Sequence, residues 1–113
     1  MSLTDTQQTM DAYVRDLLNH GDYSKHFSDD VIVEVCGTDQ RYSGREAARA
    51  WIDGAHALGE IELRSAFMGE DHAAAEAQFI RKDGVSVPYS VIYDLSQGKI
   101  TALRLYFTGP VAG

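Results

Sequence analysis

The stretch "VPYSVIYDLSQGKITALRLYF", residues 87–107, has the pattern of two β-strands joined by a short turn. Both halves are rich in β-branched and aromatic side chains, which favour extended chain. Ser96, Gln97 and Gly98 separate the halves and are residues typical of turns. We therefore expect strands at 85–95 and 99–107. Ser90 is a lone hydroxyl within the first of them, and the face on which it lies bears on function.

The chain before this hairpin continues the same pattern. Residues 61–68 and 73–81 are further strand candidates, and "GED" at 69–71 separates them. Asp83-Gly84 then provides a strong signal for a tight hairpin turn. A meander of antiparallel strands is predicted for this half of the chain.

The N-terminal half has helical periodicity instead. Residues 4–19 place their apolar side chains on one stripe, and residues 45–58 do the same after Ser43-x-x-Glu46, which has the pattern of a capping box. A β-branched run at 31–36 predicts a strand between them. Helices followed by an antiparallel meander indicate an α+β fold with the helices packed on one face of a single sheet.

Composition limits the possible partners. At 113 residues we expect a single domain, 1–113. The net charge of −7 disfavours nucleic acid and membrane surfaces, and no run approaches the ~18 apolar residues of a membrane span. Cys36 stands alone, and the histidines at 20, 26, 56 and 72 lack metal-ligand spacing. We expect a cytoplasmic protein without metal or cofactor, with His56 on the solvated face of its helix.

Several segments together resemble a known superfamily. They are "LNHGD" (18–22), "FSDDVIVEV" (27–35), "SGREAARAWI" (43–52), "VPY" (87–89) and "GKITALRLYF" (98–107). In this order they are similar to the nuclear transport factor two-like superfamily, in particular its SnoaL-like polyketide cyclase and ketosteroid isomerase branches. The resemblance covers nearly the whole chain. It implies a strongly curved antiparallel sheet wrapped around N-terminal helices, a cystatin-like cone with an apolar pocket for a small hydrophobic molecule, and a homodimer.

The resemblance also marks where the family's catalytic side chains would stand. In the isomerases the proton-shuttling aspartate matches Val35, the protonated acid matches Ser90, and the tyrosine matches Val14, with Tyr13 one residue away. The aspartate that SnoaL-like cyclases often use matches Phe107-Thr108. The resemblance therefore implies a member without the usual catalytic residues.

Since relatives keep a hydrogen-bond donor at the position of Ser90, we expect Ser90 to point into the cone. Strand alternation then places Ile92 and Asp94 on the same inner face. The opposite, outer face would offer a dimer surface made of Tyr89, Val91 and Tyr93. The expected ligand-binding residues are Val14, Val35, Trp51, Ser90, Ile92, Leu103, Leu105 and Phe107.

Candidates for catalysis are few. Tyr13 and Ser90 are possible donors to an oxyanion. Glu76 is expected to face water because its alternate neighbours would take the inner face, and burying an unpaired carboxylate is costly. Glu76 or Asp94 at the cavity floor would nevertheless support an enzyme.

Two functions stay open. The first is a small-molecule-binding SnoaL-like domain that has lost the catalytic carboxylates and is not a ketosteroid isomerase by the usual mechanism. The alternative is an isomerase, cyclase or lyase that acts on a small hydrophobic carbonyl compound through an enolate. Acid–base catalysis needs a titratable group within hydrogen-bond reach of the substrate, and its absence from the expected positions favours binding.

Overall fold

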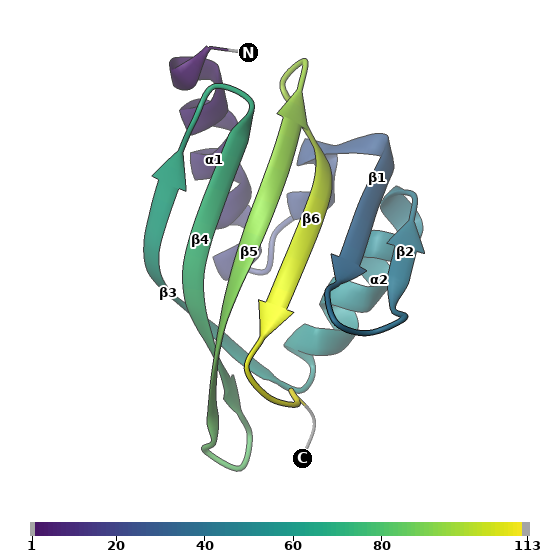
Figure 1. The fold of residues 1–113 in the computed structure, drawn as a ribbon, viewed down its shortest axis with the longest axis vertical. Coiled ribbons are helices and arrows are strands. Elements are labelled where there is room, and N and C mark those ends of the chain that lie inside the picture. Colours follow the sequence, from purple (N-terminus) through teal and green to yellow (C-terminus); the bar gives the residue numbers. More distant parts are fainter. Residues whose placement is uncertain (1, 112–113) are drawn as a thin grey trace.

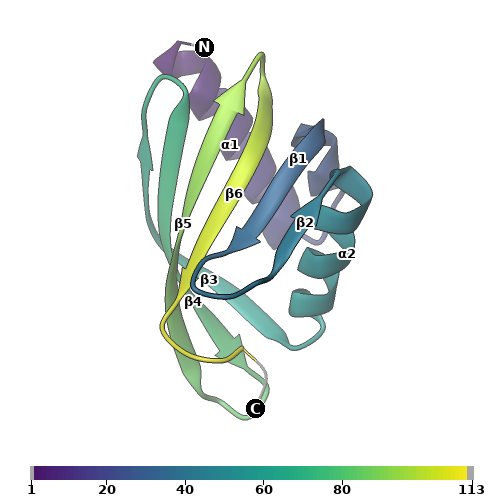
Figure 2. The same ribbon diagram turned by 45° about the vertical axis from the view of Figure 1, so that its right-hand side comes forward.

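A computed structural model describes residues 2–111, in which two α-helices lie on one side of a six-stranded sheet (Figure 1). The elements in chain order are α1 (Leu3–Leu18), the 3-10 helix η1 (Tyr23–His26), β1 (Phe27–Val35), β2 (Arg41–Ser43), α2 (Arg45–His56), β3 (Gly59–Met68), β4 (His72–Arg81), β5 (Ser86–Ser96) and β6 (Lys99–Phe107). Figure 2 shows the bend of the sheet toward the helices. The predicted α+β class and curved sheet are confirmed. None of the described helices is long and apolar enough to cross a bilayer.

The strands are arranged in the order β2-β1-β6-β5-β4-β3. β3 to β6 form the predicted antiparallel meander. β1, however, runs parallel to β6, with Val33 opposite Leu103 and Val35 opposite Leu105, so the sheet is mixed. The direction follows from the topology. β3 forms the far edge of the sheet and is antiparallel to β1. Because β3, β4, β5 and β6 alternate in direction, β6 is parallel to β1 (Figure 1).

The helix starts differ from those expected. Ser2 caps α1, and its side chain and that of Asp5 form a capping box. Ser43 was expected to cap the second helix in a capping box with Glu46, yet residues 41–43 form β2 on the edge of β1. Because Ser43 belongs to this strand, α2 follows Gly44, which has a φ of 94° and no side-chain cap.

Register shifts accompany the curvature of the sheet. One lies between Leu63 and Ser65 of β3, and another lies in the pairing of β5 with β6, where Asp94 and Leu95 pair with Ala102 and Ile100. Such irregularities bend a strand and increase its twist. The helices pack on the concave face that results, mainly over the flanking strands: α1 contacts β3 and β4, and α2 contacts β1, β2 and β3.

Side-chain alternation on β4 is as predicted, and β1 alternates in the same way. On β1 the valines at 31, 33 and 35 are buried, whereas Glu34 lies between them on the other face. On β4 the inner face carries Ala73, Ala75, Ala77 and Phe79, and Glu76 is exposed. Three alanines in a row leave the inner face of β4 shallow, so larger side chains from other elements fill the space above it.

Gly59 begins β3 where the backbone leaves no room for a side chain. A Cβ there would lie 2.2 Å from the carbonyl oxygen of Ile80 and 2.9 Å from the ring of Phe79. Gly59→Ala must push β3 away from β4, and we expect it to lower the free energy of unfolding by about 1–3 kcal/mol. Chemical denaturation measures the loss.

Gly54→Ala is the matched control in α2. A Cβ at Gly54 meets nothing within 4 Å, so replacing a helical glycine should raise stability by up to about 1 kcal/mol. Equal denaturation midpoints for the two variants would contradict the close approach at Gly59.

Candidate functional site

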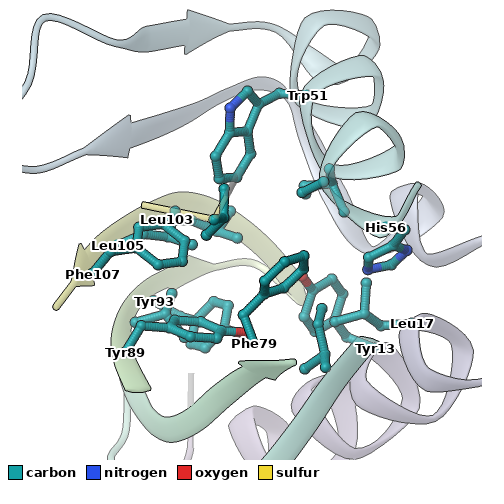
Figure 3. A pocket seen from close by; sticks show the side chains of 15 residues that line it. Tyr13, Leu17, Trp51, His56, Phe79, Tyr89, Tyr93, Leu103, Leu105 and Phe107 are labelled. Atoms are coloured by element: carbon teal, nitrogen blue, oxygen red, sulfur yellow. The ribbon is translucent and has the colours of Figure 1, made fainter. Parts of the chain in front are cut away.

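An apolar chamber lies between the two helices and the concave face of the sheet (Figure 3). Its volume is about 50 Å³, and side chains from α1, α2 and β3 to β6 line it. In Figure 3 His56, Leu17 and Tyr13 stand on the helix side, facing Leu105 and Phe107 of β6 across the space. The chamber has room for only a few water molecules.

A wider cleft of about 490 Å³ adjoins the chamber at the end of β6. Val35 and Gln40 line it from the β1–β2 side, and residues 107–111 line it from the other. Trp51, Phe107 and Val111 line both spaces, and we call these three residues the partition. The cleft alone falls within the 300–1,000 Å³ range of small-molecule sites, and the chamber extends it inward.

Three phenols of the chamber stay protonated at neutral pH. Tyr13 and Tyr93 are buried, and their hydroxyls are hydrogen-bonded to each other. Burial raises the pKa of both far above its ordinary value of 10.0. Burial also raises the pKa of Tyr89 to about 12. These groups are therefore neutral hydrogen-bonding groups.

An imidazole reaches the same chamber. His56 is the last residue of α2, and its Nε2 is buried without a hydrogen-bond partner among residues 2–111. Burial, together with the nearby His20, lowers the pKa of His56 below its ordinary 6.5, against an opposing effect of Asp53. At neutral pH this side chain is therefore an uncharged imidazole.

His56 also borders a polar cavity on its other side. This cavity, of about 300 Å³, is lined by charged and aromatic side chains that include His20, Arg49 and Asp53. The Tyr23 hydroxyl donates to Asp53 Oδ1 at 2.5 Å, and the Arg49 guanidinium lies 5.7 Å from the centre of the Tyr23 ring. His56 thus separates an apolar space from a polar one.

The structure places part of the predicted ligand-binding set around these spaces. Trp51, Leu103, Leu105 and Phe107 line the chamber, and Val35 lines the cleft. On α1 the residue at the chamber is Tyr13, while Val14 packs against the core as a half-buried side chain. Whether any of them contacts a ligand stays a prediction.

The prediction of which β5 side chains point into the cone is wrong. Tyr89, Val91 and Tyr93 line the chamber, so they cannot form the expected dimer surface. Ser90, Ile92 and Asp94 lie on the convex face. The reason is the alternation itself: the odd positions of 87–95 are all apolar or aromatic, whereas the even ones include the polar Ser90 and Asp94, and the larger apolar set takes the core side.

The convex-face residues are engaged with each other rather than with the chamber. Asp94 accepts two hydrogen bonds from Arg104, at 2.6 and 3.0 Å, and its pKa is lowered mainly by that guanidinium. His72 Nδ1 lies 3.0 Å from the same carboxylate, and Glu76 accepts a bond from Ser65 at 2.9 Å. A homodimer through this face stays a prediction.

His56 is the imidazole of the chamber, and sequence reasoning missed it because it was expected to face solvent. The spacing held a signal for it: Ala48 and Ile52 are the buried residues of α2, and position 56 continues their four-residue period. Among residues 2–111 no group of three or more His, Cys, Asp or Glu could hold a metal ion.

The likeness to known proteins extends over most of the chain. A family model described as a SnoaL-like domain matches residues 10–103. No curated protein matches the sequence significantly. An NTF2-like protein of unknown function from Mesorhizobium loti superposes with a TM-score of 0.84 at 19% identity, over 95% of this chain and 93% of that one.

Two further solved structures share the fold. A candidate ketosteroid isomerase from Kribbella flavida has a TM-score of 0.84 at 14% identity, over 96% of this chain and 81% of that one. A candidate SnoaL-like polyketide cyclase from Jannaschia sp. CCS1 has a TM-score of 0.76 at 14% identity, over 93% and 86%. At these identities the likeness to solved structures concerns the fold. The family match runs from α1 into β6, and the chain therefore belongs to the SnoaL-like domain family.

Proposed function

We propose that this protein binds a small, uncharged, largely apolar molecule in the chamber and the adjoining cleft. The observation that carries the proposal is a concave apolar space whose ionisable lining groups, the three phenols and His56, are all neutral at pH 7. An apolar wall with a few polar groups of fixed position is the usual character of a ligand site. A charged ligand would find no opposite charge in the chamber and would lose its hydration on entry.

Size indicates how such a ligand would sit. The chamber of about 50 Å³ is smaller than any drug-sized molecule, whereas the cleft of about 490 Å³ is not. We propose that the ligand lies in the cleft and reaches the chamber by displacing the partition. Val111 belongs to the segment after β6 and Trp51 is half-buried, so both are placed to move at modest cost.

The polar groups favour a ligand with one carbonyl or hydroxyl. In the pair of Tyr13 and Tyr93, one hydroxyl donates its proton to the oxygen of the other. The proton of the second hydroxyl is left for another acceptor. Nε2 of His56 lacks a protein partner and gains one from a ligand hydroxyl or carbonyl, according to its tautomer. A buried polar group that finds a partner recovers about 1–3 kcal/mol of desolvation cost.

The second candidate is an enzyme: an isomerase, cyclase or lyase for a small carbonyl compound, as the names of two similar structures suggest. The family's usual acid positions do not supply its catalyst, because Val35 is apolar and Ser90 lies on the convex face. The imidazole of His56 at the chamber wall is the observation that favours this candidate.

A filled chamber should abolish binding. Ala55 lines the chamber, and Ala55→Phe would occupy most of it, whereas Ala50→Phe adds the same side chain to an exposed position of α2. A thermal-shift screen of terpenoids, steroids and aromatic ketones should find ligands that stabilise the protein by ~2.7 kcal/mol at 100 times Kd, which is several degrees. Ala55→Phe should lose this shift and Ala50→Phe should keep it. A library without any hit on the unaltered protein would refute the proposal.

The neutral state of His56 should appear in the pH dependence of stability. With its folded pKa below 6.5, the unfolded chain binds more protons between the two values, so the free energy of unfolding rises with pH across that window. The contribution is complete above about pH 6.5 and is lost as the pH falls through the lowered pKa. Urea denaturation from pH 4.5 to 8 measures the slope.

His56→Gln should flatten this slope because Gln does not titrate, and Ala50→Gln, at an exposed position of α2, should leave it unchanged. The carboxylate of Asp94 does not interfere, because its pKa is lowered from 3.8 and it titrates at more acid pH. A His56→Gln slope equal to that of the unaltered protein would show that His56 is not desolvated.

A further inference from the structure

We propose that His56 is a catalytic residue, the proton-transfer group of an enzyme that abstracts a proton from the carbon next to a bound carbonyl group. This inference rests on the proposed binding function. It assigns the chemistry to the last turn of α2 rather than to the strand positions where the family resemblance placed the acids.

The position of the imidazole carries the inference. His56 lines the chamber together with Leu17 and Ala55, and its Nε2 is buried and unpartnered among the described residues. A buried nitrogen that bonds to nothing in the protein costs stability, and such an exception in a folded protein calls for an explanation. A bound molecule in the chamber is within reach of the ring, and proton transfer requires that proximity first.

The surroundings keep the imidazole of His56 in its neutral form, which can accept a proton. His20 lies against it, with ring centres 5.6 Å apart, and Asp53 and Tyr23 border the polar cavity on the same side. Tyr13 shares the chamber with it, and Glu60 of β3 lines a smaller cavity beside it. Among these, burial and His20 lower the pKa of His56 and Asp53 raises it, with the lowering dominant.

The hydrogen-bond donor for the substrate is the Tyr13–Tyr93 pair, in which Tyr13 comes from the helix side of the chamber and Tyr93 from the sheet side. Tyr93 projects from β5 on the sheet side, while His56 projects from the helix side (Figure 3). The Tyr13–Tyr93 pair is neutral and retains one hydroxyl proton for a further acceptor. A carbonyl oxygen bonded to the Tyr93 hydroxyl would place its neighbouring carbon toward the helix side, where the imidazole is.

The step balances without a cofactor. Nε2 takes the proton as the C–H bond breaks, and the bond electrons form a carbon–carbon double bond while the carbonyl oxygen becomes an enolate. The phenol stabilises that negative charge by hydrogen bonding. The imidazolium then returns its proton to the same carbon or to another carbon of a conjugated chain, which exchanges or isomerises the substrate.

Deuterium exchange on a simple ketone tests this step. With 2-tetralone in D2O, NMR spectroscopy follows the loss of the hydrogens next to the carbonyl. We expect exchange above the buffer rate, and we expect its protein-dependent part to fall about 100-fold in His56→Gln, the lower range of acid–base contributions. His72→Gln should keep the full rate. The rate should rise with pH through a midpoint below 6.5.

His56→Ala separates chemistry from structure, because free imidazole added to that variant should restore part of the exchange. Thermal shift with 2-tetralone and a series of larger aromatic ketones reports binding separately. Binding without exchange, or equal exchange in His56→Gln, would overturn the assignment and leave the binding function standing. Failure of the unaltered protein to bind any of these ketones would overturn both.

Discussion

The bend of the sheet is the constraint on which the site depends. Register shifts in the β3–β4 and β5–β6 pairings accompany it, and two α-helices among residues 2–111 cover the concave face. Because α1 and α2 pack mainly over the flanking strands, the middle strands β5 and β6 are left to be covered by side chains. Aromatic rings from both layers fill most of that space, with Tyr13 packed edge-on against Tyr93 at 5.8 Å. The chamber is the part that these rings leave open.

The low polarity of this space determines the state of each polar group inside it. A charge there loses its hydration without gaining a partner, so the phenol pKa values rise and that of His56 falls. Tyr13 and Tyr93 reduce the cost of burial by bonding to each other, whereas Nε2 of His56 does not share in such a pair. The chamber therefore holds a bonded pair of phenols, Tyr13 from the helix side and Tyr93 from the sheet side, and an imidazole on the helix side whose Nε2 is unbonded among residues 2–111.

Much of the fold could be predicted from residue patterns, because local periodicity and turn residues determine the helices and the meander. The parallel pairing of β1 with β6 could not, since it joins segments distant in sequence. The facing of β5 was predicted from a family position, and the alternation of Val91 and Tyr93 with Ser90 outweighs that resemblance because it decides how much apolar surface is buried. Residue spacing is also the better guide in α2. His56 is four residues after the buried Ile52, which is four residues after the buried Ala48, and it lies on their side of the helix although it is polar.

The two walls of the chamber differ in what a substitution costs. A strand position on the concave face is tied to its neighbours by the hydrogen-bonded ladder, and a carboxylate there must be buried beside apolar side chains. The last turn of a helix is freer: His56 has one side toward the chamber and another toward a polar cavity that holds Arg49 and Asp53. A titratable group at that border keeps contact with charged neighbours while reaching the apolar space. Chemistry can therefore move from the sheet to the helix without any change in the fold, which is why a shared fold does not fix a shared reaction.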